Sequence, residues 1–357
     1  MFAIVPAGGQ GSRLWPLSRV SHPKFLLDPV ADFGIGSRED ASVASGASVA
    51  SGVSLLDLTL RRLAPLSESV TVVGSAATRL PIGNYLVEPS AKNSLGAAAL
   101  AARQLRELHG DGVCGFFPAD HLIANTDEFA AVVSAAVHLA RDNHLVTVGV
   151  SPSTAATGYG YIGVGERVPF NSGSDAAPWA FTATAFFEKP DAARARAFVD
   201  SGAYLWNSGM YFFRADLLLD WARELVPGYS AWLDGADPCD PELWEGLPNT
   251  PIDRALSEPL AALGSVAVVV AEDLGWSDVG DFAALRELSD GDGRLLNLES
   301  PGTRLFAGAD VSARERVVVL GVPDVVVVRT SDATLVVNPD FAQRVGELPA
   351  LLPEEYR

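Results

Sequence analysis

The sequence Phe2-Ala-Ile-Val-Pro-Ala-Gly-Gly-Gln-Gly-Ser-Arg-Leu-Trp-Pro-Leu17 opens the chain as an apolar strand that runs directly into a glycine-rich loop. A loop of this kind brings backbone N–H groups close to phosphate oxygens. It is not a GxxxxGK[ST] P-loop, because it contains no Gly-Lys pair, and it is not a GxGxxG dinucleotide loop, because Leu14 stands where the third glycine belongs. The remaining GxGxR pattern, with Pro23-Lys24 after it, offers the charges of Arg13 and Lys24 to a triphosphate. We therefore predict a nucleotide-phosphate site at the end of the first strand.

Outward from this loop, short apolar runs alternate with stretches rich in Ala and Leu. The predicted strands are Phe2–Pro6, Ser69–Val73, Gly115–Pro118, Leu145–Val150 and Val266–Ala271, and the predicted helices are Ala97–His109 and Asp127–Asp142. Such alternation is typical of an α/β domain with a largely parallel sheet. Ligands of these sheets bind at the carboxyl ends of the strands, which is where the glycine-rich loop begins.

The pattern of apolar residues changes after about residue 295. Val-rich strands are predicted at Arg316–Leu320, Asp324–Arg329 and Thr334–Val337, and an amphipathic helix at Pro339–Leu352. We therefore expect a catalytic domain over residues 1–290 and a small β-rich C-terminal unit with a terminal helix over residues 295–357. Residues 30–54 contain the sequence Ala41-Ser-Val-Ala-Ser-Gly46 twice in succession, and we interpret them as a flexible surface insertion, either an inert loop or a mobile lid.

Composition limits the function classes. The 357 residues include 26 basic and 44 acidic side chains, and a net charge of −18 argues against nucleic acid or an anionic membrane surface as a partner. The two cysteines, Cys114 and Cys239, form no cluster that could bind zinc. The chain begins without a signal-peptide pattern, and its longest apolar run has only the length of a buried strand. We expect a soluble, cytoplasmic protein.

Several further motifs carry a family resemblance. They are Glu88-Pro89 with Asn93, Phe117-Pro-Ala-Asp-His121, Thr157-Gly-Tyr-Gly-Tyr-Ile162, Phe187-Glu-Lys-Pro190, Leu205-Trp-Asn-Ser-Gly-Met210 and Trp276-Ser-Asp-Val-Gly280. Together with the N-terminal loop, in this order, the chain resembles the bacterial mannose-1-phosphate guanylyltransferases of the sugar-nucleotidyltransferase superfamily. The resemblance implies a Rossmann-like mixed, mostly parallel sheet with helices on both faces, and a C-terminal unit that resembles part of a β-helix. It also implies a homodimer, because the C-terminal unit of this family commonly mediates subunit contacts.

The resemblance implies the site residues one by one. Nucleotide contacts fall on Ala7, Gly8, Gly9, Gly11, Ser12, Arg13, Lys24, Glu88, Asn93 and Asp120. Sugar contacts fall on Gly158, Tyr159, Gly160, Glu188, Lys189, Asn207 and Gly209. The catalytic set is Arg13, Lys24, Asp120, Lys189 and Asp278, in which Asp120 and Asp278 are the Mg²⁺ ligands.

Each assignment has a simpler alternative. An aspartate after a strand is often only a helix cap, although two at neighbouring strand ends can share one Mg²⁺. The glycines at 158 and 160 fit an ordinary hairpin turn, and Glu188-Lys189 fits a surface ion pair. His121 is expected to be structural, since Mg²⁺ prefers oxygen ligands.

The implied activity is transfer of GMP from GTP to α-D-mannose 1-phosphate, which gives GDP-mannose and pyrophosphate. The alternatives are the same chemistry with another nucleotide or another hexose or heptose 1-phosphate, and a non-catalytic regulatory relative. The chain departs from the family pattern at Lys92, where arginine is usual, and in Pro251-Ile-Asp-Arg-Ala255, where Ser-Ile-Asp-Tyr-Ala is usual. Lysine lacks the planar fork of arginine, so the contact made at position 92 differs from that of the family. Both departures bear on base and sugar selectivity.

Overall fold

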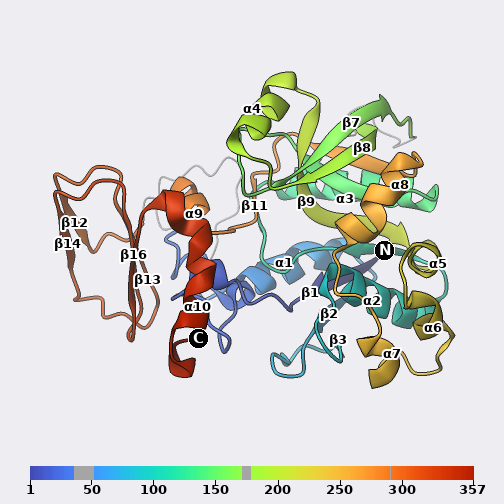
Figure 1. Cartoon of the computed structure of the whole chain (residues 1–357), viewed down its shortest axis with the longest axis horizontal. Coiled ribbons are helices and arrows are strands. Elements are labelled where there is room, and N and C mark those ends of the chain that lie inside the picture. Colours follow the sequence, from blue (N-terminus) through green and yellow to red (C-terminus); the bar gives the residue numbers. More distant parts are fainter. Residues whose placement is uncertain (36–51, 171–177, 290) are drawn as a thin grey trace. The chain divides into compact units, whose positions relative to one another are not determined.

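A computed structural model describes residues 1–35, 52–170, 178–289 and 291–357 (Figure 1). Most of the predicted insertion, residues 36–51, lies outside the described residues. The chain divides into two compact units, each built from separate segments. Unit 1 contains Met1–Gly8, Arg61–Pro118 and Asn125–Leu274, and unit 2 contains Gly9–Leu60, Ala119–Ala124 and Gly275–Arg357.

Unit 1 is built on a nine-stranded sheet in the order β3-β2-β1-β4-β9-β6-β10-β8-β7. The strands are β1 (Phe2–Pro6), β2 (Ser69–Gly74), β3 (Tyr85–Val87), β4 (Val113–Phe116), β6 (Leu145–Val150), β7 (Gly160–Arg167), β8 (Ala180–Glu188), β9 (Tyr204–Arg214) and β10 (Val266–Ala271). Only β8 and β9 run against the other seven, so the sheet is mixed but mostly of one direction, as predicted. The strand expected at Gly115–Pro118 lies two residues earlier, which leaves the segment after Phe116 free to form a loop.

Helices cover both faces of this sheet (Figure 1). The helices are α2 (Asn93–His109), α3 (Thr126–Arg141), α4 (Ala192–Ser201), α5 (Ala215–Leu225), α6 (Tyr229–Asp234), α7 (Pro241–Glu245) and α8 (Glu258–Ala262), with a π-helical turn at Asp253–Ser257. Successive residues of a strand point to opposite faces. Phe2 and Ile4 accordingly share a core with α2 and α5, whereas α3 packs on β6, β9 and β10 outside that core.

Unit 2 combines the N-terminal loop with the C-terminal β-rich segment. Its strands are β5 (Leu122–Ile123), β11 (Trp276–Ser277), β12 (Leu295–Leu298), β13 (Arg304–Ala307), β14 (Val317–Leu320), β15 (Val326–Arg329) and β16 (Thr334–Val337). Its helices are α9 (Phe282–Leu288), α10 (Leu348–Leu351) and short 3₁₀ helices at Ser12–Leu14, Lys24–Leu26, Pro339–Glu347 and Glu354–Tyr356. Helix α1 (Leu55–Leu63) crosses the border between the units, and a 3₁₀ turn at Ala64–Leu66 follows it.

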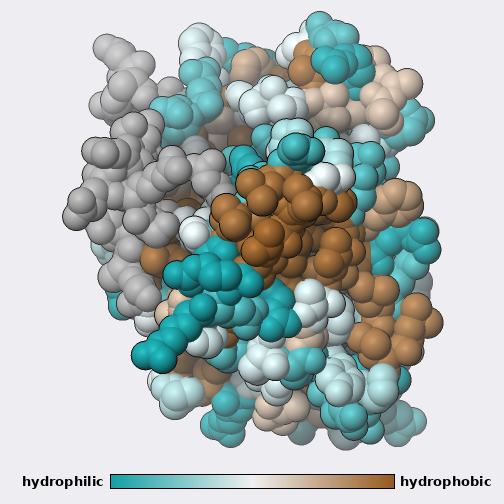
Figure 2. All heavy atoms as spheres, turned by 90° about the vertical axis from the view of Figure 1, so that its left-hand side faces the viewer, coloured by the Kyte–Doolittle hydropathy of each residue, from teal (hydrophilic) through white to brown (hydrophobic). Residues whose placement is uncertain are grey.

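The C-terminal strands form two stacked coils. Strand β12 pairs in parallel with β14, β13 pairs in parallel with β15, and β16 closes this second pair in the antiparallel sense. The β13–β15 side is buried against the N-terminal loop in a core that includes Leu14, Trp15, Phe282, Phe306 and Val345. The β12–β14 side presents apolar residues outward, and Figure 2 shows them as a continuous hydrophobic patch.

Two local expectations need correction. The segment around Gly158 and Tyr159 is not a hairpin turn, because it connects β6 to β7 and these two strands do not pair. The terminal helix is mostly a 3₁₀ helix over Pro339–Glu347, followed by the single turn α10. Pro349, which has no N–H group to donate to the preceding turn, stands at the junction.

Among the described residues, no helix is both long and apolar enough to cross a bilayer.

The core of unit 2 gives a stability prediction. Phe306 is 1% exposed and its ring lies 6.1 Å from that of Phe282. We expect Phe306→Ala to lower the free energy of unfolding by about 3–5 kcal/mol, because it removes a packed ring and leaves a cavity. The matched control Leu263→Ala, at a side chain that is 71% exposed, should change it by less than about 0.5 kcal/mol. Urea unfolding measures both, and equal values for the two variants would contradict the prediction.

Candidate active site

The glycine-rich loop of unit 2 is folded closely around Lys24. Gly11 has a positive φ of 68°, and a Cβ atom there would lie 2.3 Å from the Cβ of Lys24. The backbone N–H of Lys24 donates to the carbonyl of Gln10 at 3.2 Å, and the Ser18 hydroxyl donates to the carbonyl of Gly11 at 2.6 Å. Only glycine fits at position 11, because both the backbone conformation and the approach of Lys24 exclude a side chain.

The Lys24 ammonium joins the two predicted metal ligands. It pairs with Asp120 Oδ2 at 2.7 Å and donates a hydrogen bond to the backbone carbonyl of Asp278. The two aspartate segments are held together by the antiparallel pairing of β5 with β11, in which Ser277 lies opposite Leu122. The structure therefore brings Lys24, Asp120 and Asp278 into one cluster.

His121 reinforces this cluster without acting as a ligand in it. The indole N–H of Trp276 donates to His121 Nδ1 at 3.1 Å, and the two rings meet edge to face at 5.4 Å. The bond leaves Nδ1 unprotonated and fixes the loop of Asp120 against the loop of Asp278.

The two carboxyl groups have different electrostatic environments. Burial raises the pKa of Asp120, but the charge of the Lys24 ammonium and the hydrogen bonds to the carboxylate outweigh it and hold the pKa below its usual value. Burial raises the pKa of Asp278, and the neighbouring Asp120 adds to this effect while Lys24 and Arg13 oppose it. Asp278 Oδ1 is buried and has no hydrogen-bond partner in the described part of the chain.

A buried carboxylate oxygen without a partner is costly, and a cation would satisfy it. Within the described ranges, no group of three or more His, Cys, Asp or Glu side chains could hold a metal ion. Mg²⁺ is commonly held by one or two carboxylates, with waters and substrate phosphates completing its six ligands. Asp120 and Asp278 therefore fit a magnesium ion that arrives with a phosphate ligand.

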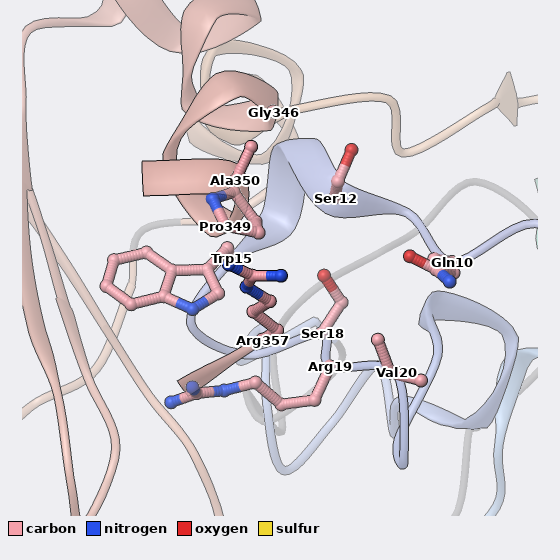
Figure 3. Close-up of a pocket in the computed structure, with 10 residues that line it drawn as sticks. All are labelled: Gln10, Ser12, Trp15, Ser18, Arg19, Val20, Gly346, Pro349, Ala350 and Arg357. Carbon is pink, nitrogen blue, oxygen red and sulfur yellow. The ribbon is translucent and has the colours of Figure 1, made fainter. Parts of the chain in front are cut away.

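A cavity of about 300 Å³ adjoins the glycine-rich loop in unit 2 (Figure 3). Its lining consists of Gln10, Ser12, Trp15, Ser18, Arg19, Val20, Gly346, Pro349, Ala350 and Arg357. Arg19 is committed to its own neighbours, because it pairs with Asp332 at 2.8 Å and lies 5.3 Å from the centre of the Trp15 ring. The loop thus has open space beside Gln10 and Ser12.

Unit 1 supplies the other predicted nucleotide residues. Ala7 is buried and its N–H donates to Val73 at 2.7 Å, which leaves Gly8 as the first accessible loop position. A Cβ atom on Gly8 would lie 3.2 Å from Glu88 Oε1. Burial raises the pKa of Glu88 to about 6, although the Lys92 backbone N–H opposes the shift. Gly8 and Glu88 are therefore neighbours, whereas Asn93 is exposed at the start of α2.

Lys92, at the departure from the family pattern, has a definite partner in unit 1. Its ammonium donates to both the carbonyl and the carboxylate of Glu245 at 3.1 Å. The Ser90 hydroxyl donates to the same carboxylate at 2.6 Å, and Trp244 donates to the Ser90 carbonyl at 2.9 Å. The Lys92 side chain thus ties its loop to α7.

The predicted sugar residues gather around the β7–β8–β9 part of the sheet. Gly160 of β7 lies opposite Glu188 of the neighbouring strand β8. A Cβ atom on Gly160 would lie 3.0 Å from Glu188 Oε2 and 3.4 Å from Asn207 Cβ. The backbone N–H of Lys189 donates to the carbonyl of Tyr159 at 3.3 Å. Lys189 and Glu188 form an exposed ion pair at 3.0 Å, so their charged ends are open to a ligand.

Asn207 is the centre of a partly buried hydrogen-bond network. Its Oδ1 accepts from the Gly209 N–H at 3.1 Å and from the Thr147 hydroxyl at 3.3 Å. Its Nδ2 donates to Tyr211 at 3.3 Å and to Asp253, and Tyr211 also donates to Asp253. Burial raises the pKa of Asp253, against its bonds to Tyr211 and Asn207. The protein itself uses both ends of the Asn207 amide.

Three residues at or next to predicted site positions have an unusual backbone conformation. Asn93, Lys189 and Val279 have positive φ values of 64°, 44° and 48°. A positive φ is a genuine outlier for a β-branched residue such as Val279, which directly follows Asp278. Strain of this kind concentrates at ligand and catalytic sites.

The predicted residues thus form two groups, one in each unit. Gly9, Gly11, Ser12, Arg13, Lys24, Asp120 and Asp278 belong to unit 2, and the nucleotide residues Ala7, Gly8, Glu88 and Asn93 and all predicted sugar residues belong to unit 1. Sequence reasoning missed Tyr211, Asp253 and Gln343. Tyr211 could have been found, because it lies only four residues after Asn207 on the same strand. Asp253 also had a local signal, because Pro251-Ile-Asp-Arg-Ala255 retains the aspartate of the family pattern Ser-Ile-Asp-Tyr-Ala. Gln343 comes from a distant segment and carries none.

Two family models match the chain. The model described as nucleotidyl transferase matches residues 75–293, and the model described as MannoseP isomerase/GMP-like beta-helix domain matches residues 307–349.

Individual relatives match over nearly the whole chain. Mannose-1-phosphate guanylyltransferase ManC of Salmonella typhimurium is 34% identical over 379 residues, covering 98% of this chain and 72% of that protein. Xanthan biosynthesis protein XanB of Xanthomonas campestris is 32% identical over 362 residues, covering 97% and 72%. A Thermus thermophilus crystal structure, described as a mannose-1-phosphate geranyltransferase, has a TM-score of 0.78 and 28% identity and covers 98% of both chains. This chain therefore belongs to the mannose-1-phosphate guanylyltransferase family of nucleotidyl transferases and is an enzyme of that type.

Proposed function

We propose that the protein transfers GMP from GTP to α-D-mannose 1-phosphate and releases pyrophosphate. The observation that carries this proposal is the Lys24 cluster, in which one ammonium is bound by Asp120 and by the carbonyl of Asp278 beside the GxGxR loop. Relatives named mannose-1-phosphate guanylyltransferase support the choice of acceptor. The retained charges argue against a non-catalytic relative.

The chemistry needs no side-chain base. An oxygen of the sugar phosphate attacks the α-phosphorus of GTP in line, a new P–O bond forms, and the bond to the β-phosphate oxygen breaks. A phosphate monoester is already anionic, so the barrier lies in bringing two anions together and in aligning them. Alignment of this kind can contribute up to roughly 7–11 kcal/mol.

The residues of unit 2 would hold the triphosphate. Gly9, Gly11 and Ser12 would offer backbone contacts, and Arg13 and Lys24 would stabilise the charge that develops on pyrophosphate. Asp120 and Asp278 would hold Mg²⁺, which, when bound, would supply positive charge that stabilises the reacting phosphates. The buried Asp278 Oδ1 without a partner among the described residues supports this assignment.

The residues of unit 1 would hold the nucleoside and the sugar. Gly8, Glu88 and Asn93 would lie near the base and ribose. Lys189 would exchange its exposed pairing with Glu188 for the sugar phosphate, because the dianion is the stronger partner. Glu188 would then be free to accept hydrogen bonds from sugar hydroxyls, with Gly158, Tyr159 and Gly160 beside the ring.

A second candidate keeps this chemistry with another nucleotide or another hexose or heptose 1-phosphate. The specific observation that favours it is the engagement of Lys92 with Glu245, which uses up the cation that stands where the family has arginine. The cytoplasmic location stays a prediction.

The function is tested by pyrophosphate release with Mg²⁺, with four nucleoside triphosphates crossed against mannose, glucose and other sugar 1-phosphates. We expect the highest kcat/KM with GTP and mannose 1-phosphate. A maximum at another pair would select the second candidate, and no release with any pair would contradict both.

The metal assignment gives a second prediction. Asp120→Asn and Asp278→Asn should each lower kcat by about 100-fold or more, because each removes a carboxylate that positions charge at the reacting phosphates. Asp111→Asn is the control, since Asp111 forms an exposed ion pair with Arg106. Steady-state rates measure the effect, and near-wild-type turnover in either variant would rule out the metal site.

We also propose that the protein is a homodimer that docks through the outer patch, defined as Leu296, Leu298, Val318, Leu320 and Val322. Leu296 lies opposite Val318 and Leu298 opposite Leu320, so the side chains form one surface, and they are between 45% and 65% exposed. Together they expose on the order of 500 Å² of apolar area, which is much of the ~800 Å² that each partner buries in a standard interface. A second copy is the occupant that this area and the family resemblance support.

Leu320→Glu should convert the dimer to a monomer, because a charge would be buried against its own copy at a symmetric contact. Leu263→Glu, at an exposed apolar residue of unit 1, is the matched control. Light scattering after size-exclusion chromatography measures the mass. A monomeric wild type, or a Leu320→Glu variant that stays dimeric, would contradict the proposal.

A further inference from the structure

The 3₁₀ helix Pro339–Glu347 touches the glycine-rich loop at two positions on one side. Gln343 Oε1 accepts a hydrogen bond from Arg13 Nη1 at 2.9 Å. Three residues later, a Cβ atom on Gly346 would lie 3.1 Å from Arg13 Cγ and 3.2 Å from the Ser12 hydroxyl. Residues three apart in a 3₁₀ helix are eclipsed, so the two contacts act together. Figure 3 shows Gly346 and Ser12 on these adjoining segments.

The orientation of the Gln343 amide is fixed from its other end. Its Nε2 donates to Asp281 Oδ2, and Asp281 Oδ1 accepts the N–H of Ala284 at 2.9 Å as the cap of α9. Asp281 is buried. A carboxylate accepts only, so the amide nitrogen must face Asp281 and the amide oxygen must face Arg13. The chain Arg13–Gln343–Asp281 therefore has one direction.

Arg13 has a neutral partner rather than an acidic one. In the described part of the chain, no carboxylate lies within ion-pair distance of its guanidinium, and the guanidinium donates its hydrogen bond to an amide oxygen. A carboxylate in place of Gln343 would form the same hydrogen bond but would neutralise the charge. The amide orients Arg13 and leaves its full positive charge for an anionic ligand.

We propose that Gln343 is a positioning residue, which holds the Arg13 guanidinium for the triphosphate of the nucleotide without neutralising it. This inference rests on the proposed function, because it takes Arg13 as a triphosphate ligand. It gives the C-terminal segment, which matches the β-helix family model, a part in nucleotide binding.

The variants Gln343→Ala, Gln343→Glu and Gly346→Ala test the proposal. Gln343→Ala should raise the KM for the nucleoside triphosphate about tenfold and leave the KM for the sugar phosphate within about twofold, because one hydrogen bond to a charged group is lost. Gln343→Glu should raise the KM for the nucleoside triphosphate further, since the new carboxylate pairs with Arg13 and repels Asp281. Gly346→Ala should act in the same direction as Gln343→Ala, by displacing the Arg13 side chain. Arg344→Ala is the control on the same helix, because Arg344 is exposed and forms an ion pair with Glu347.

A merely structural role for Gln343 would lower thermal stability and kcat and leave the KM values of both substrates unchanged, with no difference in KM between the alanine and glutamate variants. That result would overturn the inference and leave the proposed function intact. Calorimetric titration of GTP into the wild-type protein and the variants separates a failure of the inference from a failure of the proposed function, because it measures binding without turnover. Binding that is weakened in the Gln343 variants but not in Arg344→Ala supports the inference even if the wild type releases no pyrophosphate. A wild type that binds no nucleoside triphosphate overturns both.

Discussion

The buried ion pair between Lys24 and Asp120 is the interaction on which the unit 2 site depends. The Lys24 side chain is only 8% exposed, and an unpaired ammonium in that position would be costly. Its partners come from the two short segments that join unit 2 beside the N-terminal loop, the carboxylate of Asp120 and the carbonyl of Asp278. Lys24 therefore cannot stay in place unless both aspartate segments do. Gly11 completes the arrangement, because only glycine lets the loop approach the Lys24 stem.

The charges around this pair are incompletely matched. Lys24 satisfies one oxygen of Asp120, whereas Asp278 Oδ1 is buried without a partner among the described residues and Arg13 donates to an amide oxygen. One site that offers both an unsatisfied anion and an unneutralised cation suits a ligand that itself brings both signs. A nucleotide triphosphate with its magnesium ion is such a ligand.

Sequence reasoning captured what is locally encoded. Strands β1, β6, β10 and β16 have the predicted bounds, because each is a short apolar run ended by turn residues. Helix α2 begins four residues earlier than expected, at Asn93, where the Ala-rich pattern has not yet started. The antiparallel insertion of β9 between β4 and β6 was not predicted, since strand order depends on long-range pairing. The dependence on long-range contacts also limits what sequence reasoning predicts about the candidate site. The loop and the Asp120 and Asp278 motifs are predicted from local sequence, whereas the contacts of Asn207 with Asp253 and of Arg13 with Gln343 span 46 and 330 residues of sequence.

The β-rich C-terminal segment cannot be treated as an appendage of the glycine-rich loop. Leu14 and Trp15 of the loop share one core with Phe306 and Val345, and Gly346 packs against Arg13. Contacts therefore divide the chain differently from the two family models, which separate residues 75–293 from residues 307–349. Because packed cores transmit displacement, a change in the stacked coils will shift the loop that carries Arg13. Selection on the C-terminal strands would then act on the conformation of the glycine-rich loop as well as on the outer patch.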